Sequence, residues 1–65
     1  MSDRTTFDDI YDSLINGQNK QVVRQIQEMG LHKVPDMLDY FSDELCNQEV
    51  AVRAMKIYFA ITYNS

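Results

Sequence analysis

Apolar side chains recur every three or four positions through the C-terminal half of the chain. This spacing is that of one face of an α-helix. Among the positions on this face, Gln48 is the only polar one between Leu45 and Val52. Pro35 suits the first turn of such a helix, because its missing N–H would have no intrahelical partner there. The members of this first stripe are Val34, Leu38, Phe41, Leu45, Val52, Met55 and Phe59.

The first stripe fits two arrangements of its backbone. One is a long amphipathic helix that begins at about Pro35, and the other is two helices in nearly the same register. Ser42 and Asn47 can each cap a helix internally. A break between Leu45 and Gln48 and an unbroken helix are therefore both compatible with the sequence.

The N-terminal half predicts two shorter helices. Thr6 followed by Asp9 has the form of a capping box, so a helix is expected to begin at Phe7 and residues 1–6 to be frayed. The sequence Asn16-Gly17 tolerates the left-handed backbone that closes a helix. A second helix is expected from a cap at Asn19 to Met29, where Gly30 stops it.

The C-terminal residues 57–63 also permit a strand, because they are rich in β-branched and aromatic side chains. A strand here would need another copy of the chain to pair with, since no other segment offers a partner. We therefore predict a helix. The expected fold is all-α: a small bundle of three to four helices with a long amphipathic C-terminal helix, in one domain covering residues 1–65.

A second apolar stripe runs along the same C-terminal segment and points away from the first. A helix that is apolar nearly all round is buried on both sides. A chain of 65 residues has too few helices to surround it, so we expect a second copy to cover the second stripe and predict a homodimer. The self-association residues in this prediction are Val50, Ala54, Ile57 and Ile61.

Charge and cysteine content exclude several classes of protein. Ten acidic and six basic side chains give a formal net charge of −4, which repels phosphate backbones, so direct nucleic-acid binding is not expected. No apolar run approaches the ~20 residues of a membrane span, and the N-terminus has no signal-peptide core. With one cysteine and no internal disulfide, we predict a cytoplasmic protein.

No set of residues predicts catalysis, a cofactor or a metal. His32 lies in a linking segment without a catalytic neighbour and is expected at the surface. Cys46 has no base to activate it and is expected to be a half-buried structural thiol. The acidic residues Asp8, Asp9 and Asp12 are expected to be solvated at a helix start, because the pattern lacks a calcium-binding loop.

An acidic stripe shares the face opposite the first apolar stripe. Asp36, Asp39 and Asp43 follow helical spacing, and Tyr40 projects from the same side. Tyrosine brings contact area with little entropy loss and a polar tip, so it is enriched at interfaces. These four residues are the predicted partner-binding acidic face, although a merely solvated helix face is the alternative.

The sequence favours a non-enzymatic protein interaction or regulatory module that acts through helix surfaces on a protein partner it does not identify. The alternative is an acidic inhibitor that mimics nucleic acid, of the type found among viral accessory factors, and binds a basic, nucleic-acid-binding host protein. The two hypotheses differ in salt dependence, because charge mimicry is screened over about 8 Å at physiological ionic strength and apolar docking is not.

Overall fold

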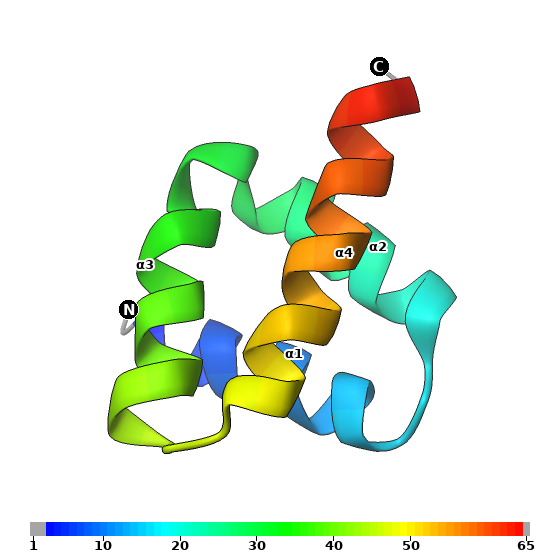
Figure 1. Ribbon diagram of the computed structural model, residues 1–65. Coiled ribbons are helices and arrows are strands. Elements are labelled where there is room, and N and C mark those ends of the chain that lie inside the picture. The colour runs from blue at the N-terminus through cyan, green and yellow to red at the C-terminus, as the bar shows by residue number, and fades with distance from the viewer. Residues whose placement is uncertain (1–2, 65) are drawn as a thin grey trace.

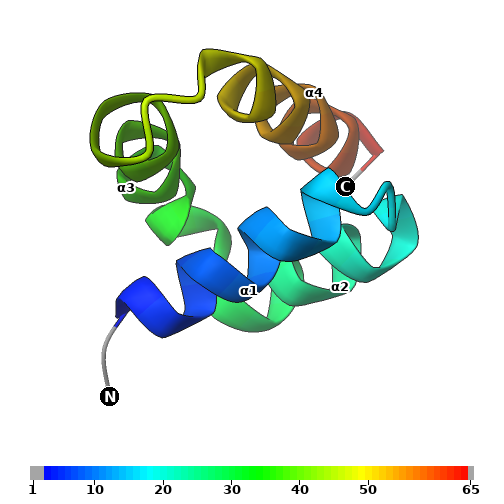
Figure 2. The same ribbon diagram turned by 90° about the horizontal axis from the view of Figure 1, so that it is seen from below.

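Four α-helices follow one another in the computed structural model, which describes residues 3–64 (Figure 1). Figure 2 shows that α1 lies beside α2, and that α3 and α4 together face this pair. No strand occurs in the part of the chain that the structure describes, so the all-α prediction is confirmed and residues 57–63 are helical. The helices are α1 (Asp3–Ile15), α2 (Asn19–Met29), α3 (Val34–Asp39) and α4 (Gln48–Asn64), with a 3₁₀ turn at Leu31–Lys33 and a π-helical turn at Tyr40–Glu44.

The N-terminal helix begins one turn earlier than its capping pattern predicts. It starts at Asp3, not at Phe7, so Thr6 lies inside α1 and does not cap it. Phe7 is buried in the core, and packing of an apolar face stabilises a helix more than a local cap signal does. The expected fraying is therefore wrong for residues 3–6, and residues 1–2 lie outside the described part.

The connection between α1 and α2 follows from Gly17. Its φ of +73° is a left-handed conformation that glycine adopts without strain. The Gln18 N–H donates to the Ser13 carbonyl at 2.9 Å and the Gly17 N–H to the Leu14 carbonyl at 3.1 Å, which is a Schellman motif. The predicted bounds of α2 are confirmed, but Gln18 and not Asn19 occupies its N-cap position.

The C-terminal half forms two helices with a break between them, which was one of the two predicted arrangements. The π-helical turn ends at Glu44, and Cys46 follows with a φ of +49°. Asn47 then caps α4, because its side-chain oxygen accepts from the Val50 N–H at 3.2 Å. Ser42 does not cap a helix, since its hydroxyl donates back to the Leu38 carbonyl at 2.9 Å.

The hydrophobic core lies between the α1–α2 pair and the α3–α4 pair. All four helices contribute to it, and the only buried polar residue in the described part is Ser13, whose hydroxyl donates to the Asp9 carbonyl at 3.1 Å. The core consists of Phe7, Ile10, Leu14, Val22, Ile26, Val34, Met37, Phe41, Val50, Ala51 and Ala54.

The structure reverses the predicted roles of the two faces of α4. Val50 and Ala54 are buried in the core, and Ile57 and Ile61 are half-buried against it. These four residues were predicted to be an uncovered self-association face, and that prediction is wrong because they lie in the core of the bundle or pack against it. The left-handed turn at Cys46 directs α4 back across the bundle, so the stripe on α3 does not continue on the inner side of α4.

Candidate functional site

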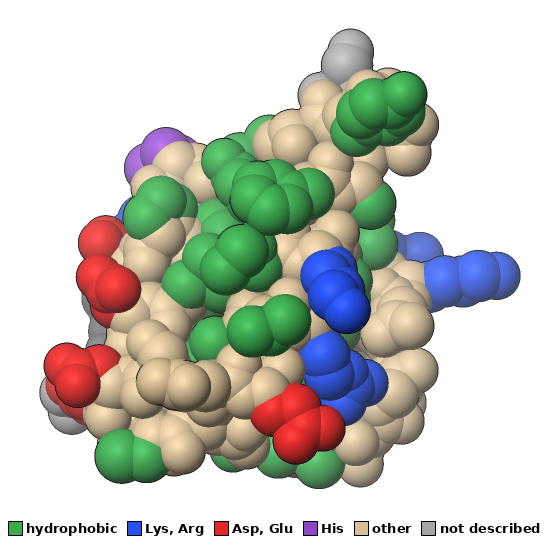
Figure 3. All heavy atoms as spheres, in the orientation of Figure 1, with side chains coloured by type: hydrophobic (Ala, Val, Ile, Leu, Met, Phe, Trp, Pro, Cys, Tyr) green, Lys and Arg blue, Asp and Glu red, His purple; other side chains and the backbone are tan. Residues whose placement is uncertain are grey.

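The outer side of α4 carries an apolar surface that the bundle leaves uncovered. Val52 is 46% exposed, Met55 37%, Phe59 57% and Tyr63 90%. These four residues recur at spacings of three and four and are called the α4 outer face below. Figure 3 shows apolar side chains gathered along α4 in the view that faces it. Val52, Met55 and Phe59 belong to the first stripe of the sequence analysis. The sequence therefore grouped these three residues correctly but did not predict that they are exposed.

A shallow groove of about 480 Å³ extends this surface toward α3. Pro35 and Leu38 form its apolar wall on α3, and Val52 and Met55 form the wall on α4. Asp39 lines the same groove and is exposed. The groove therefore combines an apolar interior with one carboxylate at its edge. Its full lining is Pro35, Leu38, Asp39, Ser42, Gln48, Ala51, Val52 and Met55.

Charges of opposite sign flank the α4 outer face. On the α3 side, Asp36, Asp39 and Asp43 are exposed. On the other side of α4, Lys56 is exposed and Arg53 is half-buried, with the exposed Glu49 one helical turn before Arg53. Figure 3 shows acidic side chains over α3 at the left, apolar ones along α4 and basic ones further right, with an acidic side chain below the basic ones. The prevailing charge therefore differs between the two sides of the α4 outer face.

The predicted acidic face is present, but Tyr40 has a different role in it. Its ring is half-buried, with centroids 5.7 Å from Phe7 and 6.1 Å from Phe41. Its hydroxyl donates to the Asp8 carboxylate at 2.6 Å. Tyr40 therefore joins α1 to the π-helical turn, and the prediction of a free aromatic anchor is wrong.

The aspartates of that face border a shallow hollow of about 280 Å³. Asp36, Asp39 and Asp43 line it from one side, together with Glu44. Phe7 and Tyr40 form its apolar part. Of the described residues that line the hollow, none is Lys or Arg, so its edge is uniformly acidic.

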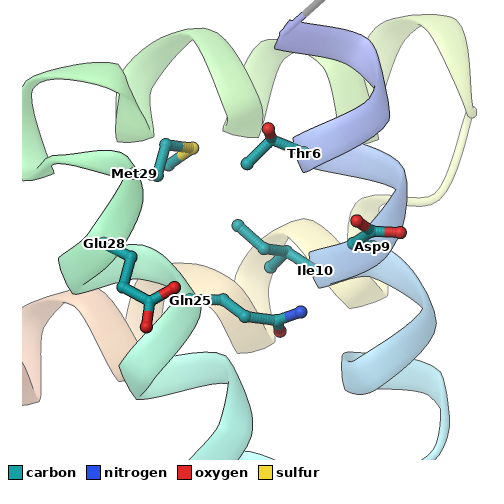
Figure 4. A pocket seen from close by; sticks show the side chains of 6 residues that line it. All are labelled: Thr6, Asp9, Ile10, Gln25, Glu28 and Met29. Carbon is teal, nitrogen blue, oxygen red and sulfur yellow. The ribbon is translucent and has the colours of Figure 1, made fainter.

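A further hollow of about 300 Å³ lies between α1 and α2 (Figure 4). Carboxylates from both helices border it, Asp9 from α1 and Glu28 from α2. The side-chain oxygen of Gln25 is buried there without a hydrogen-bond partner. The remaining lining residues are Thr6, Ile10 and Met29.

The residues considered for chemistry are dispersed. Within residues 3–64, no three His, Cys, Asp or Glu side chains lie close enough to hold a metal ion. His32 is exposed, as predicted. Cys46 is exposed and donates to the Asp43 carbonyl at 3.2 Å. The expected half-buried thiol is therefore wrong, because the left-handed backbone at this position turns the side chain out of the core.

The features of the described residues that bear on function are therefore surface patches and grooves. Among the described helices, none is long and apolar enough to cross a membrane. Four of the five large hydrophobic side chains that are exposed among the described residues lie on the α4 outer face, and the acidic edge of α3 adjoins its groove. Comparison of the chain with protein-family models, with curated proteins and with solved structures finds no match.

Proposed function

We propose that this chain is a non-enzymatic protein interaction module that binds its partner through the α4 outer face and the adjoining groove. The observation that carries the proposal is the exposure of Phe59, at 57%, between the exposed Met55 and Tyr63 on the α4 outer face. Aromatic side chains dominate the energy of many protein interfaces. A cytoplasmic location fits the single cysteine, which leaves no internal disulfide to form.

The size of the surface supports a binding role. If a fully exposed aromatic side chain offers roughly 200 Å², Phe59 and Tyr63 together expose about 300 Å² at their exposed fractions of 57% and 90%. Val52, Met55 and the groove walls enlarge this area. The patch falls in the range of about 300–600 Å² that the largest apolar patch of a monomer reaches, and such patches are often functional.

Affinity capture with matched variants tests the proposal. The tagged chain is used to capture proteins from an extract of cells that also express an untagged copy, at low and high salt. Phe59→Asp places a charge on the α4 outer face, whereas Gln27→Asp places the same charge on an exposed position of α2. Apolar burial is insensitive to screening, so we expect a captured protein that persists at high salt, is retained by Gln27→Asp and is lost with Phe59→Asp.

The proposal fails if Phe59→Asp captures the same proteins as the wild type. Because Phe59 is more than half exposed, its replacement is expected to leave the fold intact. Far-UV circular dichroism of both variants checks that point. A protein captured equally by both variants would bind another surface of the bundle.

A second candidate function is the acidic mimicry of nucleic acid toward a basic protein. The observation that favours it is the acidic edge of the hollow beside α3, with Asp36, Asp39 and Asp43 all exposed. Replacement of the three aspartates with asparagine would then abolish capture, and high salt would do the same. Capture that survives both treatments would exclude mimicry and leave the α4 outer face as the binding surface.

A further inference from the structure

The distribution of charge about the α4 outer face identifies its partner, if that face is the binding surface proposed above. We propose that the occupant is a second copy of this chain, with the two α4 helices packed face to face and parallel about a two-fold axis. The previously predicted self-association residues play no part in this contact, because they lie in or against the core.

The two sides of the face carry opposite charges. Asp39 lines the groove on the α3 side of Val52 and Met55. Lys56 follows Met55 by one position, which is a rotation of about 100° around the helix toward the side away from α3. Figure 3 shows the acidic side chains over α3 on one side of the apolar surface and basic side chains, with an acidic one beside them, on the other, so basic charge prevails on the side away from α3. A second copy therefore carries the charge that each side lacks.

Only one orientation of the two-fold axis brings these charges together. An axis that crosses α4 at right angles makes the two α4 helices antiparallel and places each acidic side on the acidic side of the other copy. An axis that runs along α4 makes them parallel and places each acidic side on the basic side of the other copy. Like charges in contact are unfavourable, so the charge pattern selects the parallel arrangement. In it, Lys56 of one copy faces Asp39 of the other.

The spacing of residues on the outer side of α4 fits the same arrangement. Gln48, Val52, Met55 and Phe59 are separated by four, three and four positions, which is the spacing of the seam between two paired helices. Val52 and Phe59 then occupy equivalent positions, and a β-branched residue such as Val52 at that position favours two strands. Lys56 falls on the flank, where charged residues of paired helices meet.

The available area sets the strength of the contact. A patch of about 300–600 Å² on each copy buries about 600–1,200 Å² in total, at or below the roughly 1,200 Å² at which stable interfaces begin. The dimer is therefore weak and depends on concentration. Salt screens the exposed Lys56 and Asp39 pairs but not the apolar contact of the α4 outer face, so the association persists at high salt.

Sedimentation equilibrium of the full chain tests the contact. We expect the apparent mass to rise from 7.6 kDa toward twice that value between about 10 μM and 1 mM chain, the range suited to a small interface. Asp39→Lys alone and Lys56→Glu alone each place like charges together twice, so each is expected to weaken association about tenfold. The double variant restores opposite charges at both contacts and is expected to associate like the wild type.

Disulfide formation tests the orientation. Thr62 continues the seam three positions after Phe59. Thr62→Cys is made in a Cys46→Ser background, and Gln21→Cys in the same background is the control on α2. In the parallel dimer the two introduced cysteines at position 62 lie side by side and are expected to cross-link. In an antiparallel dimer centred near Ile57 they would lie about 15 Å apart along the helix axis. Cross-linking at position 21 as fast as at position 62 would overturn the proposal.

The outcomes separate this inference from the proposed function. A monomer at every concentration, or single charge reversals without effect, overturns the second copy as the occupant. If Phe59→Asp still loses a captured protein in that case, the interaction module stands with a different partner. A dimer that Phe59→Asp leaves unchanged uses another surface and overturns the second copy as the occupant of the α4 outer face.

Discussion

Two valines of α4 provide a direct test of which side of this helix faces the core. Val50 is 5% exposed and Val52 is 46% exposed. They lie two positions apart in the same helix, so replacement of each with alanine removes the same atoms. We expect Val50→Ala to destabilise the fold clearly and Val52→Ala to leave its stability almost unchanged.

The magnitude follows from the buried methyl groups. Valine to alanine removes two carbons, worth about 1.6 kcal/mol when fully buried at about 0.8 kcal/mol each. Val50→Ala loses nearly all of this burial free energy and leaves a cavity, whereas Val52→Ala loses about half of it. Alanine has the better helix propensity by up to ~0.7 kcal/mol at both positions, so this term cancels in the comparison. The two variants are expected to differ by about 1–2 kcal/mol.

Urea denaturation followed by circular dichroism at low chain concentration measures the difference in the monomer. A gap of 1 kcal/mol corresponds to about 4–8 °C in Tm for a domain of this size, so thermal unfolding gives a second measurement. The burial argument is refuted if Val52→Ala costs as much as Val50→Ala or more. That result would place Val52 in the core, and Phe59 would no longer lie on a free surface.

Two turns give further predictions. Gly30→Ala is expected to cost more than about 1 kcal/mol, because φ is +108° and the new Cβ would lie 2.7 Å from the His32 ring; thermal unfolding of Gly30→Ala with and without His32→Ala separates the two causes. Asn47→Ala is expected to cost about 1–2 kcal/mol, because Asn47 caps the Val50 N–H and donates to the Tyr11 hydroxyl at 2.9 Å. Asn47→Asp keeps the cap and loses only that donor, so equal losses for the two variants in urea denaturation would contradict the cap.

The sequence predicts helix ends best where one residue carries its own backbone preference. Gly17 and Gly30 adopt positive φ values at the ends of α1 and α2, and Pro35 lies in the first turn of α3. Asn47 caps α4 by the mechanism expected of it. In each case the physical cause lies within a few residues, so the sequence alone contains it.

Features that depend on distant contacts were not predictable in the same way. The start of α1 depends on the burial of Phe7, which packs against Tyr40 from the other half of the chain. The left-handed conformation of Cys46 is supported by the Asn47 N–H, which donates to the Phe41 carbonyl at 2.9 Å. Cysteine has no particular preference for such a backbone, and no local pattern marks the position.

The sequence predicted the exposure of the aspartates on the acidic side of α3 correctly, but not the environment of Tyr40. Asp36, Asp39 and Asp43 are exposed as their helical spacing predicts. Tyr40 shares that spacing, yet its ring packs between Phe7 and Phe41 and its hydroxyl binds the Asp8 carboxylate. Spacing assigns a side chain to a face of its own helix, and only the position of α1 decides whether that face is covered.

Side-chain size decides which face of α4 is inside. Both faces are apolar, so hydrophobicity alone cannot choose between them. Ala51 and Ala54 lie on the inner face, where small side chains let α4 approach the other helices closely, whereas the larger Met55 and Phe59 lie on the outer face. A bundle of this size accepts the smaller face and leaves the larger one at its surface. An exposed Phe59 favours association, which is the physical reason to expect a partner on that side of the helix.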